Sequence, residues 1–405
     1  MTIRLLSLTA ACAFVIAGCS RASLPGNPLV PTVPAFDVPA TSSGYAVVHF
    51  FGKDNDGNEP EASLIGLRGV LYGTTFGGGS SNHGTVFEST QSGNEKVLHS
   101  FGTSEGYYPD AGLLAVRGAL YGTTESGPGS SGGGTLFEIT SSGTERVLHT
   151  FGGPPNDGAN PEADLIAANG TMYGTTTYGG KYNLGTVFSS GTGGRESILY
   201  SFKNRGDGGR PAADLTYLDG TLYGTAGTGG TNGNGVVFGV TLNGGEKVLH
   251  RFKGGVRDGS SPHAGLKVLR GMLYGTTFGG GSTGQGTVFS VTTTGSEKIV
   301  YNFTGSGSHG PDGSSPQADL IANDGTLYGT TLYGGKYGNG TVFSVTTSGL
   351  EKVLYSFKGG KQDGAFPGAG VLDLSGTLYG TAAVGGKYAK EGKGDDGGVL
   401  FRLTP

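Results

Sequence analysis

The sequence predicts an all-β fold, a seven-bladed β-propeller of four-stranded blades. Three observations lead to this prediction: a repeat of about 50 residues, four strand-like segments in every repeat, and chain ends that complement each other. The repeat is marked by a Tyr-Gly-Thr core that returns seven times along the chain. These cores begin at Tyr72, Tyr121, Tyr173, Tyr223, Tyr274, Tyr328 and Tyr379.

Four short segments follow one another in each repeat. The first resembles Ala-Asp-Leu-Ile, as at 163–166, the second is Leu-Tyr-Gly-Thr-Thr, the third Gly-Thr-Val-Phe and the fourth Val-Leu-His/Tyr-Ser-Phe. They are rich in β-branched and aromatic residues and are bounded by Gly, Asn, Asp or Ser. Such segments are typical of strands separated by turns.

The two ends of the repeat array indicate a closed ring. Residues 45–51 form an isolated segment of the fourth type, whereas residues 398–403 at the C-terminus form one of the third type. The last blade therefore lacks its fourth strand, and the N-terminal segment can supply it. We expect the two segments to pair, because closure removes an exposed sheet edge. The predicted propeller spans residues 45–405.

Composition excludes some function classes. Gly accounts for 84 of the 405 residues, but it is periodic and interleaved with 19 Tyr and 20 Phe, so the chain has apolar area to bury. Charged residues make up 14% and the formal net charge is −4. No run of Lys and Arg exists to neutralise phosphates, which argues against nucleic acid as a partner.

The first residues predict export and a lipid anchor. Arg4 precedes an apolar run that ends in Ile-Ala-Gly-Cys, and this pattern is typical of a secretory signal. The tetrapeptide resembles a bacterial lipobox, which implies a signal peptide over 1–18, lipidation of Cys19 and an outer-membrane or cell-surface location. We interpret the proline-rich stretch 19–44 as a tether between the lipid anchor and the propeller. An ordinary signal peptide with a chance cysteine is the alternative.

The Tyr-Gly-Thr-Thr, Gly-Gly, Gly-Thr-Val-Phe and Leu-His-Ser-Phe blocks resemble the GloVer tandem repeat of exported, surface-anchored bacterial proteins. The resemblance covers about residues 45–405, in all seven units. It implies an extracytoplasmic repeat protein and no activity. Kelch and quinoprotein propellers are similar in architecture, but the chain has no Trp, so their chemistry is not carried over.

The loops between the second and third strands and between successive repeats should share one face of the propeller. The latter carry an Asp-Gly pair, which we interpret as turn chemistry rather than a calcium site, since each loop has too few carboxylates. Four histidines share a repeat slot that Tyr fills elsewhere: His49, His99, His149 and His250. A slot that accepts either residue indicates packing, so we expect neither a metal nor a cofactor.

Two slots vary where the rest of the repeat is constant, and they flank the proline of the loop that enters each innermost strand. The first site hypothesis is therefore a convergent polar cluster at the mouth of the axial channel. The alternative is that these are solvated residues at the channel rim whose identity is free to change. The residues after the proline are Glu61, Asp110, Glu162, Ala212, His263, Gln317 and Gly368. Those before it are Glu59, Tyr108, Asn160, Arg210, Ser261, Ser315 and Phe366.

A Gly-Gly-Lys-Tyr sequence occurs three times in the loops between the second and third strands. Its tyrosines, Tyr182, Tyr337 and Tyr388, would suit stacking on sugar rings if they are exposed, or packing on the neighbouring blade if they are not.

Three functions fit these observations. The first is a non-enzymatic binding module that takes a surface polysaccharide or a protein partner on the long-loop face. The second is a polysaccharide lyase or hydrolase that would use Glu61, Asp110 or Glu162 with His263 or Arg210, since general acid–base catalysis needs such pairs. The third is an envelope-assembly scaffold.

Overall fold

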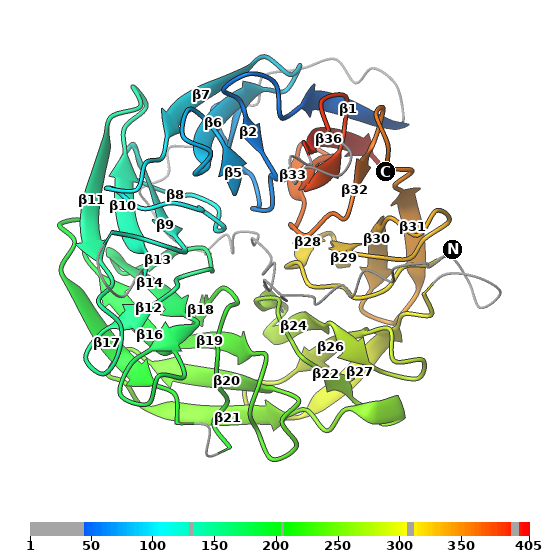
Figure 1. Ribbon diagram of the computed structural model, residues 1–405. Coiled ribbons are helices and arrows are strands. Elements are labelled where there is room, and N and C mark those ends of the chain that lie inside the picture. Colours follow the sequence, from blue (N-terminus) through cyan, green and yellow to red (C-terminus); the bar gives the residue numbers. More distant parts are fainter. Residues whose placement is uncertain (1–43, 129–132, 204–205, 306–311, 390–396) are drawn as a thin grey trace, which may run out of the picture.

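A computed structural model of the chain confirms the seven-bladed β-propeller (Figure 1). It describes residues 44–128, 133–203, 206–305, 312–389 and 397–405. Seven four-stranded antiparallel sheets stand around a common axis. The predicted signal peptide, Cys19 and nearly all of the tether lie outside the described residues, and the first strand begins at Gly44. None of the described segments is a helix long and apolar enough to cross a membrane.

Each blade runs from a short inner strand near the axis to a longer outer strand. From inside to outside, the first blade holds β3 (Ile65–Leu67), β4 (Val70–Thr75), β6 (Thr85–Thr90) and β7 (Glu95–Ser100), and the second β8 (Leu114–Val116), β9 (Ala119–Thr124), β10 (Thr135–Ile139) and β11 (Glu145–Thr150). The third holds β13 (Ile166–Ala168), β14 (Thr171–Thr176), β16 (Thr186–Ser190) and β17 (Glu196–Ser201), the fourth β18 (Thr216–Leu218), β19 (Thr221–Ala226), β20 (Val236–Thr241) and β21 (Glu246–Arg251), and the fifth β23 (Lys267–Leu269), β24 (Met272–Thr277), β26 (Thr287–Val291) and β27 (Glu297–Asn302). The sixth holds β28 (Ile321–Asn323), β29 (Thr326–Thr331), β30 (Thr341–Thr346) and β31 (Glu351–Ser356), and the seventh β33 (Leu372–Leu374), β34 (Thr377–Ala382), β36 (Val399–Thr404) and β1 (Gly44–Phe50).

The ring closes as the sequence predicts. Strand β1 pairs antiparallel with β36, so that the N-terminal segment completes the seventh blade, at the top right of Figure 1. Tyr45 of β1 stacks on Tyr355 of the sixth blade, with ring centroids 3.6 Å apart. Its hydroxyl donates a hydrogen bond of 2.5 Å to Asp363. The seam therefore has its own contacts in addition to the strand pairing.

The innermost strands are shorter than predicted. The Ala-Asp-Leu part of the first segment precedes the strand, which begins at Ile166 in the third blade, for example. The reason is that these residues hydrogen-bond between blades rather than within one. The amide of Asp164 donates to the carboxylate of Asp214 at 2.6 Å, and the amides of Gly112 and Gly265 donate to Asp164 and Asp319 of the blades that follow.

Phenylalanines fill the space between blades. The Phe that directly follows each outer strand packs edge-on against the Phe of the third strand in the next blade, with ring centroids 5.0–5.3 Å apart, as for Phe51 and Phe87. The invariant Gly of Tyr-Gly-Thr follows from this packing. A Cβ on Gly73 would lie 2.7 Å from the ring of Phe87, so a larger residue would displace the core.

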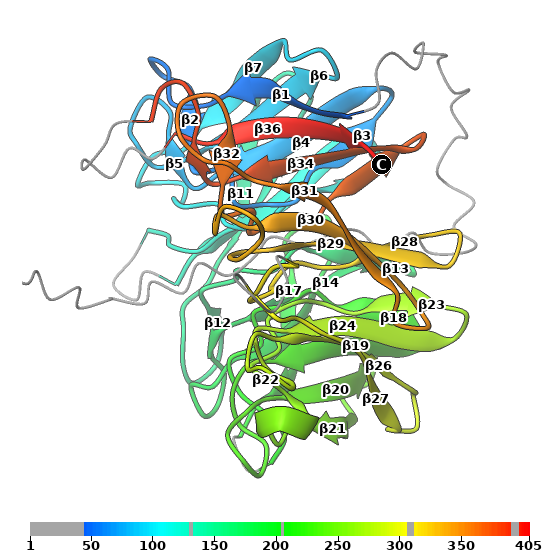
Figure 2. The same cartoon turned by 90° about the vertical axis from the view of Figure 1, so that its right-hand side faces the viewer.

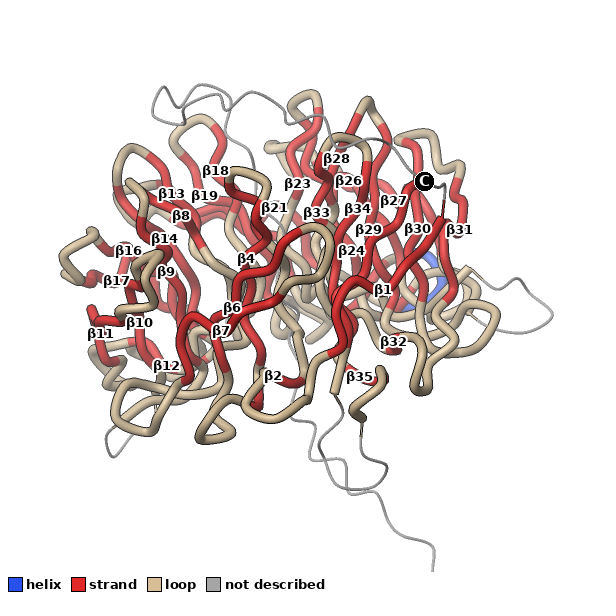
Figure 3. The backbone as a smooth tube through the Cα atoms, turned by 90° about the horizontal axis from the view of Figure 1, so that it is seen from above, coloured by secondary structure: helices blue, strands red, loops and turns tan. Residues whose placement is uncertain are grey.

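The loops predicted to share one face do so, and they pair with each other. Short two-stranded ladders join the loop after the second strand to the loop that precedes the innermost strand: β2 (Gly57–Asn58) with β5 (Gly77–Gly78), β12 (Gly158–Ala159) with β15 (Tyr178–Gly179), β22 (Gly259–Ser260) with β25 (Gly279–Gly280), and β32 (Gly364–Ala365) with β35 (Val384–Gly385). One loop also holds the 3₁₀ helix η1 (Gly255–Arg257). These ladders lie at the edge opposite the tight hairpins (Figures 2 and 3). We call this side the long-loop face.

Candidate functional site

The residue before the loop proline has the same unusual backbone in all seven blades. Its φ lies between 53° and 62°, in the left-handed region, although the side chains include aromatic and charged ones. Such a conformation is unfavourable for residues other than glycine and persists only where the surroundings fix it. These residues are Glu59, Tyr108, Asn160, Arg210, Ser261, Ser315 and Phe366.

Hydrogen bonds between blades fix this conformation. In every blade the amide of the residue before the proline donates to a carbonyl in the loop of the preceding blade, as Tyr108 does to His83 at 2.9 Å. In six of the blades its own carbonyl accepts from the amide of the residue two positions after the Tyr-Gly-Thr core, as Tyr108 does from Glu125 at 2.9 Å. The backbone frame is therefore repeated and rigid while its side chains differ, which is an arrangement suited to recognition.

This hydrogen bond adds a third varied slot to the two predicted from the sequence. We call the residues of all three slots the inner ring. The third slot, which sequence reasoning missed, holds Phe76, Glu125, Thr177, Gly227, Phe278, Leu332 and Ala383. The sequence signal that could have identified this slot is that its residue varies between repeats although the Tyr-Gly-Thr core before it is constant.

Acidic side chains of the inner ring gather on the first three blades. Glu61 and Asp110 share a side-chain hydrogen bond, and Glu162 acts electrostatically on Asp110. All three are more than nine-tenths buried. Burial, followed by repulsion between neighbouring carboxylates, raises the pKa of Glu61 to about 8 and that of Asp110 well above its usual range. The three acids predicted to lie together are thus brought together.

Glu125 is a fourth acid of this cluster, and we define the acidic sector as Glu61, Asp110, Glu125 and Glu162. Burial raises the pKa of Glu125, and its charge acts on each of the other three. Burial also raises the pKa of Glu162 to about 8, although a hydrogen bond of 2.8 Å from Thr177 favours the charged form. Arg210 lowers the pKa of Glu162 and lies over the ring of Tyr178.

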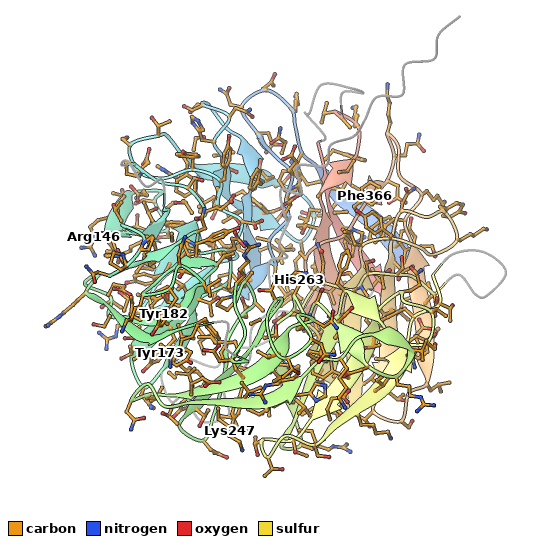
Figure 4. All side chains as sticks on the ribbon, turned by 60° about the horizontal axis from the view of Figure 1, so that its bottom comes forward. Arg146, Tyr173, Tyr182, Lys247, His263 and Phe366 are labelled. Atoms are coloured by element: carbon orange, nitrogen blue, oxygen red, sulfur yellow. The ribbon has the colours of Figure 1, made fainter. Side chains whose placement is uncertain are left out.

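An aromatic pair borders the acidic sector. Tyr108 stacks on Phe76, with ring centroids 4.6 Å apart and an interplanar angle of 9°. On the fifth blade, His263 lies edge-on against Phe278, and burial lowers the pKa of His263 to about 4, so its imidazole is neutral at pH 7. His263 lies toward the middle of the ring in Figure 4, whereas Arg146 and Lys247 mark its outer edge.

Unpaired polar atoms distinguish two members of the inner ring. Asp110 is 3% exposed and its Oδ1 atom has no hydrogen-bond partner among the described residues. Gln317, on the sixth blade, is 4% exposed, and its Nε2 atom likewise lacks a partner within the described chain. Buried polar atoms without partners are rare, because each costs about 1–3 kcal/mol. Asp110 Oδ1 can therefore accept, and Gln317 Nε2 can donate, one further hydrogen bond.

The predicted Lys-Tyr loops lie apart from one another on the third, sixth and seventh blades. Tyr182 and Tyr337 are 43% and 45% exposed, whereas Tyr388 is half-buried and its Cβ approaches Gly52. The ammonium of the preceding lysine lies 5.2–5.6 Å from each ring centroid. Exposure therefore favours a contact role for two of the three tyrosines and packing for the third.

The histidine slot is more than a packing position. We define the outer rim as the junctions at which this His or Tyr contacts the acid of the loop that follows, at 2.6–3.3 Å in all seven cases. The predicted turn role of the acid is also observed, since the Asp258 carboxylate accepts from the amides of Lys253 and Gly259. Each acid thus joins an outer strand to its loop.

A glutamate from the next outer strand completes six of these junctions, and Tyr45 completes the seventh. Burial raises the pKa of these glutamates, to about 7 for five of them: Glu95, Glu145, Glu196, Glu297 and Glu351. At the four histidine junctions, one nitrogen and two carboxylate oxygens lie within 4.8 Å of one another and could ligate a metal. The same contacts form at the tyrosine junctions, so we assign them to hydrogen bonding.

Several solved structures are similar to this one at low sequence identity. Puromycin hydrolase is 10% identical and has a TM-score of 0.52; the match covers 84% of this chain and 53% of that one. PorZ, a surface component of the type-IX secretion system of Porphyromonas gingivalis, is 14% identical over 87% of this chain and 47% of its own, with a TM-score of 0.47. An ulvan lyase is 11% identical over 89% and 96% of the two chains, with a TM-score of 0.46. No curated protein matches the chain by sequence.

The sequence also matches a family model described as the Gloeobacter/Verrucomicrobia repeat. The two matches cover residues 35–238 and 218–405, which together include all seven repeats. Both matched ranges contain the Tyr-Gly-Thr and Gly-Thr-Val-Phe blocks of the repeat. The chain belongs to the Gloeobacter/Verrucomicrobia repeat family.

Proposed function

We propose that this protein is an exported, lipid-anchored binding module that takes a cell-surface polysaccharide on its long-loop face. The observation that carries the proposal is the inner ring, where a backbone repeated in seven blades presents a different side chain in each. A purely structural position would be expected to keep its side chain, as the core phenylalanines do. Rigid frames that carry varied side chains reduce the entropy lost on binding.

A sugar is the ligand class that suits the exposed groups of this face. Tyr182 and Tyr337 offer aromatic surface, each next to a lysine that can hydrogen-bond to hydroxyl or acidic substituents. The stacked pair of Phe76 and Tyr108 offers a second aromatic surface beside buried carboxylates. Pockets that combine aromatic surface with a few placed polar groups are typical of small-ligand sites.

The full-length chain in detergent micelles, applied to a panel of bacterial and algal polysaccharides, tests the proposal. We expect retention of at least one polysaccharide without new reducing or unsaturated ends. The Tyr182→Ala, Tyr337→Ala double variant should bind more weakly, while Leu350→Ala, which removes an exposed apolar side chain, serves as the control. If no polysaccharide is retained, the proposal is wrong and a protein partner or an assembly-scaffold role becomes the better hypothesis.

The lipid anchor is tested separately. A Cys19→Ala variant should leave the membrane fraction and appear in the soluble periplasmic or extracellular fraction. Continued association with the membrane after this change would contradict lipidation at Cys19.

One observation favours an enzyme as the second candidate. With a pKa of about 8, Glu61 and Glu162 are mostly protonated at neutral pH, as a general acid must be. A polysaccharide lyase or hydrolase would place its scissile bond against these groups. Release of reducing or unsaturated ends from the panel, abolished by Glu61→Gln or Glu162→Gln, would establish this alternative in place of the binding module.

A further inference from the structure

The acidic sector brings together four carboxyls whose ionised forms burial disfavours. The charge of Glu125 raises the pKa values of the other three carboxyls, and Arg210 acts on Glu162 alone among them. Buried carboxylates in proteins are normally paired with a cation or hydrogen-bonded, because an unpaired buried charge is costly. The arrangement is therefore suited to a positively charged ligand group.

The hydrogen bonding of Asp110 supports the same conclusion. Its side chain is 3% exposed, its Oδ1 atom lacks a hydrogen-bond donor among the described residues, and Glu61, Glu125 and Glu162 all act on it. A carboxylate oxygen only accepts hydrogen bonds. An ionised Asp110 therefore suits a ligand group that donates a hydrogen bond.

The spacing of the carboxyls distinguishes an ammonium group from a metal ion. Three-ligand groups with all atoms within 4.8 Å occur in the described chain at the outer rim, but the carboxyls of the acidic sector form none. A hard cation such as Ca²⁺ needs six to eight oxygens at about 2.3–2.6 Å. An ammonium group instead donates three separate hydrogen bonds to acceptors around it.

The aromatic pair completes the site. Tyr108 stands two residues before Asp110, and its ring lies parallel to that of Phe76 on the neighbouring blade. An aromatic face attracts a nearby ammonium and also offers apolar surface to a sugar ring.

We infer that the acidic sector recognises a protonated amine on a sugar ring, which assigns the ligand to the amine-bearing polysaccharides. This inference rests on the proposed function and narrows its ligand class. Asp110 accepts a hydrogen bond from the ammonium, Glu61 and Glu162 supply neutralising charge, and the Phe76–Tyr108 pair contacts the ring. An N-acetylated sugar of the same size keeps the ring contact but loses the charge.

Binding of a cation should release protons. Glu61 and Glu162 are mostly protonated at pH 7, since their pKa values are about 8. A cation beside them favours the ionised form and lowers both pKa values, so the carboxyls lose protons when the ligand binds. Glu59, Glu125, Asp110 and Arg210 are the other charged groups that act on this pair and contribute to the same titration.

Isothermal titration calorimetry of the full-length protein with glucosamine oligomers and with the matched N-acetylglucosamine oligomers tests the inference. We expect the amine form to bind about 10-fold tighter or better at pH 7, the size of effect that one charge-assisted hydrogen bond provides. Titrations in two buffers of different ionisation enthalpy should show proton release. The Glu61→Gln, Glu162→Gln double variant should lose both the preference and the proton release.

The controls separate this inference from the proposed function. Asp54→Asn removes an exposed charge on the same face at a left-handed position that Asn tolerates, and it should leave both effects unchanged. Equal affinity for the two oligomers, or binding of other polysaccharides only, would overturn the inference while the proposed function stands. Binding of oligolysine with equal affinity and the same dependence on Glu61 and Glu162 would overturn the sugar assignment in favour of a basic protein. Failure to bind any polysaccharide would overturn both.

Discussion

The outer rim and the inner ring use the same chemistry for different ends. Both hold buried carboxyls with raised pKa values, and both recur in seven blades. At the rim the acid of each loop meets a matched donor, as Asp258 meets His250 and two backbone amides. In the inner ring the carboxyls of Glu61 and Asp110 instead hydrogen-bond to each other. In a repeat protein, the slot that stays constant carries structure, and the slot that varies is the candidate for function.

The largest expected effect is at the seam that closes the rim. Tyr45→Ala removes the stack on Tyr355 and the hydrogen bond to Asp363. We expect a loss of about 3–5 kcal/mol in the free energy of unfolding, as is usual for a packed aromatic residue replaced by Ala. Urea denaturation followed by tyrosine fluorescence measures it. Tyr182→Ala, in an exposed loop, is the matched control and should change stability by about 0.5 kcal/mol or less.

A smaller effect should appear as pH dependence of stability. The rim glutamates have pKa values near 7 when folded against 4.5 as the ordinary value, so the folded state holds more protons between these limits. Their contribution is complete below pH 4.5 and is lost as the pH rises through 7. We therefore expect the thermal midpoint to fall from pH 5 to pH 8, with a shallower slope for Glu351→Gln. A midpoint that rises over this interval would contradict the pKa assignment.

The smallest expected effect is a gain rather than a loss of stability, and it concerns the inner ring. Replacing Glu61 and Glu162 by Gln removes two buried ionisable groups whose charged forms burial disfavours. We expect this double variant to gain about 1 kcal/mol at pH 8.5, where the native carboxyls are mostly ionised, and to gain little at pH 5. Equal or greater loss of stability at both pH values would indicate that these residues hold the fold together.

The sequence predicted the fold well because each of its signals is local and is repeated seven times. Tyr-Gly-Thr, Gly-Thr-Val-Phe and the spare strand at residues 45–51 were sufficient to place strands, blades and closure. The innermost strands were predicted too long, since Asp164 and its equivalents hydrogen-bond to the next blade and not along the strand. That contact joins residues 50 apart, and a strand pattern does not reveal it.

The site was predicted in part. Variation around the loop proline identified Glu61, Asp110 and Glu162, which do lie together. It did not find Glu125, because that residue follows a different strand and joins the cluster through a backbone hydrogen bond to Tyr108. The rim was interpreted as packing and turn chemistry, since a repeat slot gives no sign of which atoms meet across a blade junction.

A matched pair of substitutions tests the central claim most directly. Asp258→Asn in the rim and Asp110→Asn in the inner ring make the same chemical change at buried carboxyls, and both variants should be measured for the urea midpoint and for retention of polysaccharide. We predict that Asp258→Asn costs about 1–3 kcal/mol of stability and leaves binding intact, because it breaks hydrogen bonds within the frame. Asp110→Asn should keep its stability and lose binding. If Asp110→Asn instead destabilises the protein as much as Asp258→Asn does and leaves binding unchanged, the inner ring is structural and the account is wrong.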